Sequence, residues 1–271
     1  MLQFTYWNEA WMGGVKMLAI ERKNAILERL QKEQRVLVAE LSQEYSVTEE
    51  TIRRDLDKLE KEGFVKKTYG GAVLNENTNI EMPLRIREKT NRKEKQTIAK
   101  LVASMIEDGD SIILDSSSTS LMVAQELKDR KKLTVITNSL EVLIEFSKSK
   151  GIQVISTGGV LKSSTLSLVG KNAEKTLENF YVDKAIISCK GLDVRKGVTD
   201  SSEADAEIKK SMVSCSKKLI LAADSTKFGT ISFAKVVDFR KGDILVTDSL
   251  PDDTWRQKLA DIGVFVVTED S

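Results

Sequence analysis

The sequence predicts a two-domain α/β protein. A small helical N-terminal domain that ends in a β-hairpin is joined to a larger domain built on a mostly parallel sheet. Between residues 21 and 74, three short amphipathic helical patterns precede a hairpin pattern. From Asp110 onward, short apolar runs alternate with helical patterns, which is typical of a parallel sheet with helices on both faces. A length of 271 residues is enough for two domains.

Three helical patterns share one predicted core in the N-terminal domain. The first begins near Glu21, and the turn between the second and the third is only Ser46 and Val47. Helices this short bury little area alone, but their apolar stripes can share one small core in a helix-turn-helix arrangement. The stripes consist of Ile26, Leu27 and Leu30 in the first helix, Leu37, Val38, Leu41 and Tyr45 in the second, and Ile52, Leu56 and Leu59 in the third.

The third pattern, SVTEETIRRDLDKL, predicts a recognition helix for DNA. Thr48 can cap its start, and Ser46 with Glu49 is an alternative capping box. A helix that enters the major groove N-terminus first needs small polar and basic residues in its first two turns. Glu49 and Glu50 oppose phosphate unless they accept from a base such as cytosine or point away, and an ordinary surface helix is the alternative. The candidate DNA contacts are Thr48, Glu49, Thr51, Arg53, Arg54 and Lys58.

A β-hairpin pattern follows the recognition helix. Gly63 ends the helix, and the run FVKKTYGGAVL predicts a hairpin with its bend at Gly70-Gly71, which is a wing. Lys66 and Lys67, beside Tyr69, would contact the DNA backbone, where cations release counterions. Because the net charge of the chain is only +1, the DNA-binding surface has to be a local patch.

The domain boundaries follow from composition. We expect a DNA-binding domain over residues 17–74, a polar linker over 75–92 that contains Pro83, and a second domain over 93–271. Residues 1–16 show no periodic apolar stripe. We expect them to be an upstream extension before a natural start at Met17, and the alternative is a genuine N-terminal arm.

Polar loops follow five of the predicted strands in the second domain. The carboxyl ends of parallel strands share one edge of the sheet, where ligands of such folds bind. One loop also opens a helix, so its hydroxyls and backbone N–H groups suit a phosphate, and helix capping alone is the alternative. The candidate ligand residues from these loops are Asp115, Ser116, Ser117, Ser118, Thr119, Ser120, Thr137, Asn138, Ser139, Gly158, Gly159, Lys190, Asp193 and Lys227.

Composition excludes several kinds of site. The chain contains no histidine, which excludes histidine bases, histidine metal ligands and histidine-containing triads. Its two cysteines, Cys189 and Cys215, fit reduced core thiols of a reducing compartment. No apolar run reaches the about 18 residues that a membrane span needs. We therefore expect a cytoplasmic protein with no cofactor, no metal and no membrane partner.

The segments ERKNAILERL, TIRRDLDKLEKEG and TYGGAV together resemble the DeoR-type bacterial transcription regulators, over about residues 17–268. The resemblance implies a winged helix-turn-helix followed by an effector-sensing domain similar to ribose-5-phosphate isomerase. It also implies a phosphorylated sugar as effector, with its phosphate at the Ser116–Ser120 loop and with Lys227 as a phosphate or carbonyl partner. Near the position of the isomerase base it offers Glu203, with Asp205 and Glu207 as alternatives. The protein is then expected to bind operator DNA as a dimer or tetramer and to repress a carbohydrate-utilisation operon.

Two other functions stay open at this point. The second domain could be a sugar-phosphate isomerase. Such an enzyme needs a carboxylate base and an acid positioned around the same substrate carbon. The isomerase pattern Asp-Gly-Ala-Asp corresponds here to CKGLD, where the first acid is missing and Lys190 intrudes, so we expect loss of activity. Alternatively, the chain could be a constitutive architectural DNA-binding protein whose large domain only oligomerises. The sequence also departs from the family pattern at Leu37, where a hydroxyl-bearing helix cap is usual.

Overall fold

The computed structural model describes residues 17–75 and 81–269. The chain divides into two compact units, Met1–Glu76 and Asn77–Ser271, which we call the N-terminal unit and the C-terminal unit. The expectation that residues 1–16 form an upstream extension lies outside the described residues.

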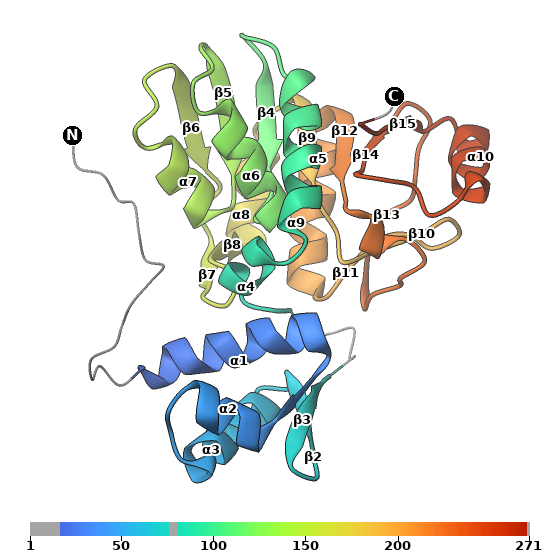
Figure 1. The fold of residues 1–271 in the computed structure, drawn as a ribbon. Helices are drawn as coiled ribbons and strands as arrows, with labels where there is room; N and C mark the ends of the chain where they lie inside the picture. Colours follow the sequence, from blue (N-terminus) through green and yellow to red (C-terminus); the bar gives the residue numbers. More distant parts are fainter. Residues whose placement is uncertain (1–16, 76–80, 270–271) are drawn as a thin grey trace. The chain divides into compact units, whose positions relative to one another are not determined.

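The N-terminal unit is a winged helix-turn-helix (Figure 1). Most of its buried side chains come from the three predicted stripes, and burying one such Leu or Ile contributes roughly 1.5–3 kcal/mol. The prediction was wrong for Leu37, which lies in a strand before the second helix and is exposed, and Tyr45 is only half-buried. The helices are α1 (Ala19–Glu33), α2 (Val38–Glu44) and α3 (Glu49–Lys61). The strands are β1 (Arg35–Leu37), β2 (Val65–Thr68) and β3 (Gly71–Leu74), in the sheet order β1-β3-β2.

The wing, the β2–β3 hairpin, differs from the expectation in two details. Its bend is Tyr69-Gly70 and not Gly70-Gly71, because Thr68 pairs with Gly71 inside the sheet. The sequence analysis also missed β1, which pairs with β3 and aligns Leu37 with Gly71. A Cβ atom at Gly71 would lie 2.0 Å from the carbonyl oxygen of Val36, so the close approach of β1 requires glycine there.

The C-terminal unit is built on a seven-stranded sheet in which every neighbouring pair is parallel, as expected (Figure 1). The strand order is β15-β14-β12-β9-β4-β5-β6. The strands are β4 (Ser111–Leu114), β5 (Leu133–Thr137), β6 (Ile152–Ser156), β9 (Val182–Ile187), β12 (Ser216–Ala222), β14 (Ile244–Val246) and β15 (Phe265–Val267).

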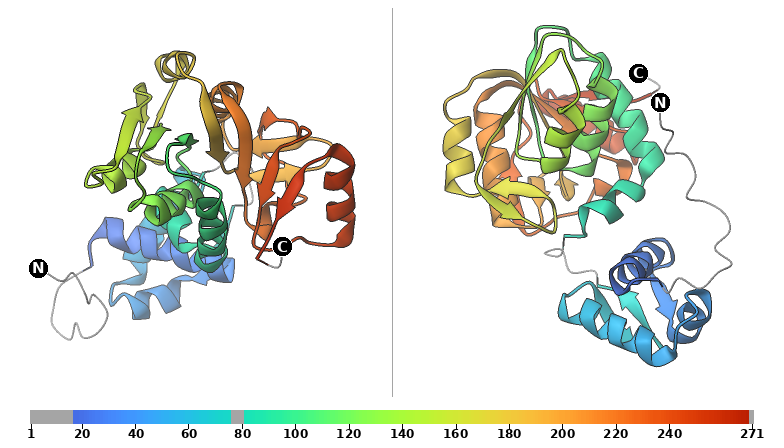
Figure 2. Two further views of the ribbon diagram at one scale, coloured as in Figure 1. Left: turned by 90° about the horizontal axis from the view of Figure 1, so that it is seen from above. Right: turned by 90° about the vertical axis from the view of Figure 1, so that its left-hand side faces the viewer.

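Helices cover both faces of this sheet (Figure 2). Successive side chains of a strand point to opposite faces, and β12 shows this: Leu219 and Leu221 join one buried cluster, whereas Ile220 joins the other. The first cluster includes α8 (Lys171–Leu177), α9 (Glu203–Ser214) and α10 (Asp253–Ile262), and the second includes α5 (Arg92–Ser104), α6 (Ser118–Leu127) and α7 (Leu140–Phe146).

Several elements lie where the sequence analysis placed none. The segment expected as a linker contains α4 (Leu84–Lys89), which buries Leu84 and Ile86. The run AIISCKGLD divides between β9 and a second strand, because that second strand belongs to a separate small sheet. The added strands are the hairpin β7 (Val160–Lys162) with β8 (Ser167–Val169), and the antiparallel sheet of β10 (Gly191–Asp193), β11 (Gly197–Asp200) and β13 (Ala234–Val237).

Within the described part of the chain, no helix has the length and apolar character to cross a membrane.

Candidate functional site

Thr48 caps the start of the recognition helix α3, which settles the choice between the two predicted caps. The Thr48 backbone is extended, and its hydroxyl accepts a hydrogen bond from the Thr51 backbone N–H at 3.3 Å. The two threonine hydroxyls also lie 2.9 Å apart. Ser46 has a φ of 51° and forms the tight turn before the helix. Thr48 therefore fixes the first turn of α3, which is the part of a recognition helix that enters the groove.

The two arginines of α3 each form an ion pair with a glutamate one turn earlier. Arg53 lies 2.7 Å from Glu49, and Arg54 lies 3.1 Å from Glu50. All four side chains are exposed, and Lys58 is exposed as well. Exposed pairs of this kind contribute about 0–1 kcal/mol, so a phosphate can replace either carboxylate at little cost.

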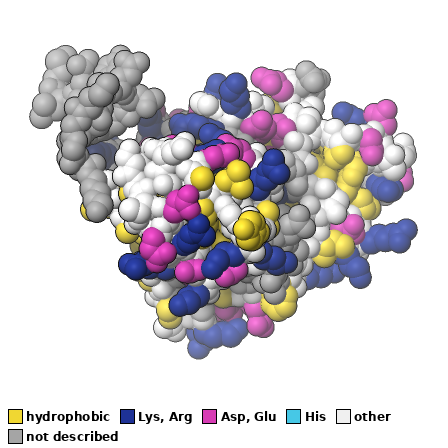
Figure 3. All heavy atoms as spheres, turned by 60° about the horizontal axis from the view of Figure 1, so that its bottom comes forward, with side chains coloured by type: hydrophobic (Ala, Val, Ile, Leu, Met, Phe, Trp, Pro, Cys, Tyr) yellow, Lys and Arg dark blue, Asp and Glu magenta, His cyan; other side chains and the backbone are white. Residues whose placement is uncertain are grey.

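The cations of the wing do not pair within their own element, as the arginines of α3 do. Lys67 pairs with Asp57 of α3 at 2.5 Å, and this carboxylate raises the pKa of the lysine. Lys66 is exposed, and Tyr69 is fully exposed at the bend. On the face that Figure 3 shows, Lys and Arg side chains (dark blue) alternate with Asp and Glu (magenta). The predicted DNA contacts thus lie on α3 and the wing within a charge-compensated surface.

A buried ion pair holds α3 against α1. Arg22 Nε lies 2.5 Å from the Asp55 carboxylate, and both side chains are almost completely buried. Arg22 also donates to the backbone carbonyl of Met17. The sequence analysis missed this pair, although Asp55 lies on the same helical stripe as Ile52 and Leu56, where a carboxylate signals a buried cation.

In the C-terminal unit, the five polar loops lie on one edge of the sheet. They follow β12, β9, β4, β5 and β6, which are consecutive parallel neighbours. The chain builds outward from β4 through β5 and β6 on one side, and from β9 through β12 on the other. The strand order therefore reverses between β4 and β9, and ligands of such sheets bind outside the carboxyl ends at this point.

Asp115 joins the two strands at that reversal. One oxygen accepts hydrogen bonds from the Ser117 backbone N–H (3.1 Å) and the Ser120 hydroxyl (2.6 Å). The other accepts from the Ser188 backbone N–H after β9 (2.9 Å) and lies 3.1 Å from Lys209 Nζ. Burial raises the pKa of Asp115, but Lys209 and the hydrogen bonds outweigh burial and hold the pKa below its usual value. The structure thus places Asp115 beneath the loop, as its support.

Lys209 extends this support into α9. Its ammonium group lies 2.5 Å from Asp200 and donates to the Ser188 carbonyl at 2.8 Å. Burial lowers the pKa of Lys209, but Asp200 and Asp115 raise it further than burial lowers it. The three charged groups are almost fully buried, and Lys209 lies within ion-pair distance of both carboxylates. Neither Lys209 nor Asp200 was predicted as a site residue.

The loop after β4 presents free hydroxyls at the start of α6. Ser117 caps the helix by accepting from the Ser120 backbone N–H at 3.0 Å. In the described part of the chain, the hydroxyls of Ser116, Ser118 and Thr119 have no hydrogen-bond partner. Free hydroxyls beside the backbone N–H groups of a helix N-terminus suit a phosphate.

The next loop contributes one unpaired acceptor. Thr137 donates to the Leu114 carbonyl, and Ser139 caps α7, so both are engaged in the fold. Asn138 donates to the Leu168 carbonyl at 3.1 Å, but its Oδ1 atom is buried without a partner. A buried acceptor left unpaired costs about 1–3 kcal/mol, which a ligand hydroxyl could recover.

The two predicted glycines of the loop after β6 are glycines for different structural reasons. Gly159 packs against β8: a Cβ atom there would lie 2.7 Å from the Val169 carbonyl oxygen. Gly158 has a φ of +62° and open space beside it, so its backbone is accessible to a ligand.

Four cations gather near the loops after β9 and β12. Lys227 Nζ lies 3.7 Å from Asp224 Oδ2, a buried atom without a hydrogen bond. Burial lowers the pKa of Lys190, and repulsion from Lys227 and then Arg87 lowers it further. Burial likewise lowers the pKa of Lys95 to about 8, with Lys227 as the next cause. Sequence reasoning found Lys190 and Lys227 but not Arg87 or Lys95, because both lie around the segment expected as a linker.

The predicted carboxylates have different surroundings. Glu203 is exposed in the first turn of α9, whereas its alternative Asp205 is buried and lies 2.5 Å from Lys162 Nζ. Asp193 accepts hydrogen bonds from the backbone N–H groups of Arg195 and Lys196, and so shapes the β10–β11 turn.

Family models match both units. The DeoR-like helix-turn-helix domain matches residues 22–78, and the DeoR C-terminal sensor domain matches residues 90–249.

Two curated relatives cover most of the chain. The HTH-type transcriptional regulator YulB of Bacillus subtilis is 45% identical over 86% of this chain and 90% of its own length. The HTH-type transcriptional repressor GlcR of the same organism is 35% identical over 92% of this chain and 96% of its own.

The similarity to solved structures is weaker. Ribose 5-phosphate isomerase A of Methanocaldococcus jannaschii is 16% identical over 51% of this chain and 55% of its own, with a TM-score of 0.40. This similarity concerns fold alone. The family models and the curated relatives together show that the chain belongs to the DeoR family of helix-turn-helix transcriptional regulators, with a DNA-binding domain followed by a sensor domain.

Proposed function

We propose that this regulator is a repressor of a carbohydrate-utilisation operon and that a phosphorylated sugar bound in the C-terminal unit controls it. One observation carries the proposal. The same edge of the sheet holds free hydroxyls at the α6 N-terminus and the cations Lys190 and Lys227. A dianionic phosphate gains there from the helix dipole, from backbone donors and from positive charge that the fold leaves partly uncompensated.

Buried hydrogen-bond acceptors without a partner suit the hydroxyl groups of the sugar. Asn138 Oδ1 and Asp224 Oδ2 are both buried without a hydrogen-bond partner, and sugar hydroxyls are donors. Gly158, in the loop after β6, offers an open approach to the backbone next to the loop of Asn138. A phosphate at the α6 loop with hydroxyls toward these acceptors uses the groups that the fold itself does not satisfy.

Repression rather than activation is supported by a relative, because GlcR is named a transcriptional repressor. The protein binds its operator as a dimer or larger assembly in this proposal, since one recognition helix with its wing covers too little DNA for high specificity. Effector binding acts by favouring one of two conformations that differ in operator affinity.

Isomerase activity is the competing proposal, and the placement of the carboxylates argues against it. Asp193 is held in a turn, Glu203 is exposed, and Asp205 is paired with Lys162. An isomerase needs a carboxylate within hydrogen-bond reach of the proton that it abstracts.

One experiment tests both proposals. The full chain is heated with a panel of pentose and hexose phosphates, and the compounds that raise its Tm are then assayed for turnover and for their effect on operator binding. We expect a raised Tm, no turnover and a changed operator affinity. Turnover would favour the enzyme, and a panel without any effect on Tm or operator binding would contradict an effector of this class.

A further inference from the structure

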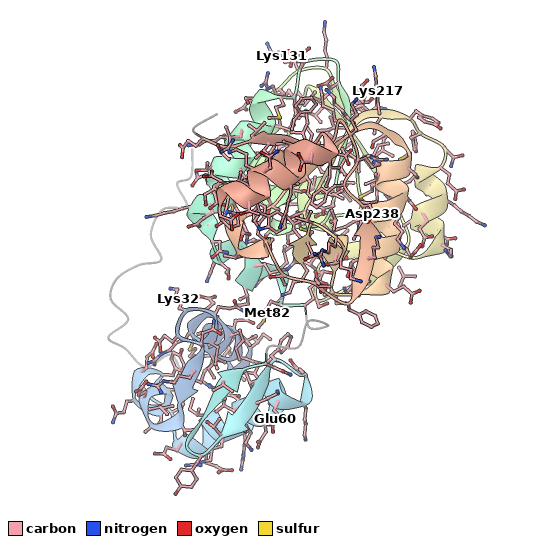
Figure 4. The ribbon with its side chains drawn as sticks, turned by 90° about the vertical axis from the view of Figure 1, so that its right-hand side faces the viewer. Lys32, Glu60, Met82, Lys131, Lys217 and Asp238 are labelled. Atoms are coloured by element: carbon pink, nitrogen blue, oxygen red, sulfur yellow. The ribbon has the colours of Figure 1, made fainter. Side chains whose placement is uncertain are left out.

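The segment Glu81–Lys95 forms one wall of the strand-end site. Asn91 Nδ2 donates to Asp224 Oδ1 at 3.0 Å and lies 3.3 Å from the Thr226 hydroxyl, in the loop after β12. Figure 4 shows Met82 at the end of the C-terminal unit opposite Lys131 and Lys217, which lie where strands begin. The segment that follows the N-terminal unit in the chain therefore reaches the edge where the strands end.

Arg87 on α4 is incompletely paired within this wall. Its Nε atom donates to the Met82 carbonyl at 3.0 Å. Its Nη2 atom is buried without a hydrogen bond and lies 3.4 Å from Glu81 Oε1, which is an ion-pair distance. A guanidinium has five N–H donors in a fork that matches phosphate oxygens, so this side chain has donors to spare.

The charges around Arg87 favour an added anion. Arg87 and Lys227 are close enough to lower the pKa of Lys190, and both also lower that of Lys95. Lys95 donates to the carbonyls of Arg87 and Thr90, which are neutral acceptors. At Lys190, repulsion from Lys227 and Arg87 outweighs the attraction of Glu81 and Asp200, and an added anion would relieve that repulsion.

We propose that Arg87 is an anion-binding residue of this site and that the ligand's phosphate draws Arg87 away from Glu81. The Glu81–Arg87 pair is then the link by which the sensor site acts on the chain segment that leads to the DNA-binding unit. This inference rests on the proposed function, because it uses the same site and the same class of ligand.

Glu81 has a second cation to hold it after the exchange. Lys162 Nζ lies 2.6 Å from Glu81 and 2.5 Å from Asp205 of α9. Burial raises the pKa of Glu81, with Arg87 and Lys162 acting in the opposite direction. If Glu81 loses Arg87 as a partner, it remains paired with Lys162. The carboxylate therefore keeps a cation partner, and its position can change.

The ligand-bound and ligand-free states then differ at Glu81, the first described residue after the segment 76–80. An effector acts only through differential affinity for two states, and this exchange of partners supplies such a difference. Arg87 favours Glu81 in one state and the phosphate in the other.

The first experiment measures anion binding to the full chain. Inorganic phosphate, titrated at constant ionic strength, is followed by the shift in Tm of the wild type and of Arg87→Met, Arg87→Lys and Arg85→Met. Arg85 lies on the same helix and is exposed, which makes it the matched control. Arg87→Met should lose roughly tenfold or more in affinity, Arg87→Lys should lose less, and Arg85→Met should bind as the wild type.

The second experiment measures the link. Glu81→Gln keeps the shape of the side chain but removes its charge. It should bind phosphate at least as tightly as the wild type and bind an operator duplex, selected from random DNA, with normal affinity. The sugar phosphate that changes operator affinity of the wild type should change that of Glu81→Gln less than half as much.

The outcomes separate the two proposals. If no phosphate or sugar phosphate binds the wild type, the proposed function and this inference both fail. If the wild type responds but Arg87→Met binds phosphate like Arg85→Met, the proposed function stands and the role of Arg87 is wrong. If Glu81→Gln responds to the sugar phosphate like the wild type, the link through Glu81 is wrong. Circular dichroism of each variant distinguishes lost binding from lost folding, and Arg87→Lys retains the test if Arg87→Met does not fold.

Discussion

The two units keep their functional ion pairs in opposite places. On the recognition helix, Arg54 and Glu50 pair at the surface with side chains 73% and 64% exposed. Beneath the sensor loop, Lys209 and Asp200 pair with side chains only 8% and 7% exposed. Surface pairs are weak and exchange readily with DNA phosphates, whereas a buried pair is expensive to break. We therefore expect the DNA-binding surface to act by exchanging ion-pair partners and the support of the sensor loop to act by keeping them.

The largest effect that we expect is on folding of the C-terminal unit. Lys209→Met should lower the free energy of unfolding by about 3–5 kcal/mol, because it leaves Asp115 and Asp200 buried without their cation. Urea denaturation measures this. The neighbouring Lys210→Met is the control, since Lys210 is exposed and pairs with Glu207 at the surface. Equal stability of the two variants would remove the contrast between buried and exposed pairs.

The second effect concerns the ligand. Replacement of Ser118 with alanine and Thr119 with valine should leave operator binding almost normal and remove the response to a sugar phosphate. Each lost donor to a charged group costs roughly 1.5–3 kcal/mol, which is tenfold or more in affinity. Titration of the effector against the operator complex measures it. A response at wild-type concentrations would mean that the loop only caps α6.

The third effect concerns the exposed pairs. Arg54→Ala should weaken operator binding roughly tenfold or more and leave the Tm unchanged, because the arginine has no buried contact to lose. If Arg54 contacts a phosphate, the salt dependence of binding should also fall by about one unit. Gel-shift titrations at several salt concentrations measure both. Lys32→Ala on α1, also exposed, is the control. If Arg54→Ala binds the operator as tightly as the wild type, the Arg54–Glu50 pair has no role in DNA binding.

The smallest effect should come from residues 1–16. A chain that starts at Met17 should melt and bind operator like the full chain, because those residues have no periodic apolar pattern. Calorimetry and gel shift compare the two chains. A clear drop in either quantity would show that the arm contributes to folding or to DNA binding.

Periodic segments were predictable because their apolar residues alone define the buried face. The stripes of α1 and α3 and the apolar runs of β4, β5 and β12 are of this kind. The edge on which the polar loops meet was predictable too, because parallel strands send their carboxyl ends the same way. Strand β1 was not, since a three-residue run such as Arg35–Leu37 shows no period.

The candidate site was predictable in its loops but not in its charges. Lys190 and Lys227 follow strands and could be located from the sequence, whereas Arg87 enters the site from a helix inside an apparent linker. The role of Asp115 depends on Lys209, which lies 94 positions later in the chain and becomes its partner only in the folded sheet. Such pairings arise from the tertiary structure and leave no local pattern.

The anchoring of Asp115 at the β4–β9 reversal has a consequence for how ligand preference can change. The loop that suits the phosphate is tied to the sheet by hydrogen bonds to both strand ends and by Lys209. Asn138 and Gly158, which we propose contact the rest of the ligand, belong to loops outside that network. We therefore expect substitutions at Asn138 and Gly158 to redirect the protein toward other phosphorylated metabolites while the phosphate stays where it is. A regulator built this way is a natural starting scaffold for engineered metabolite sensors.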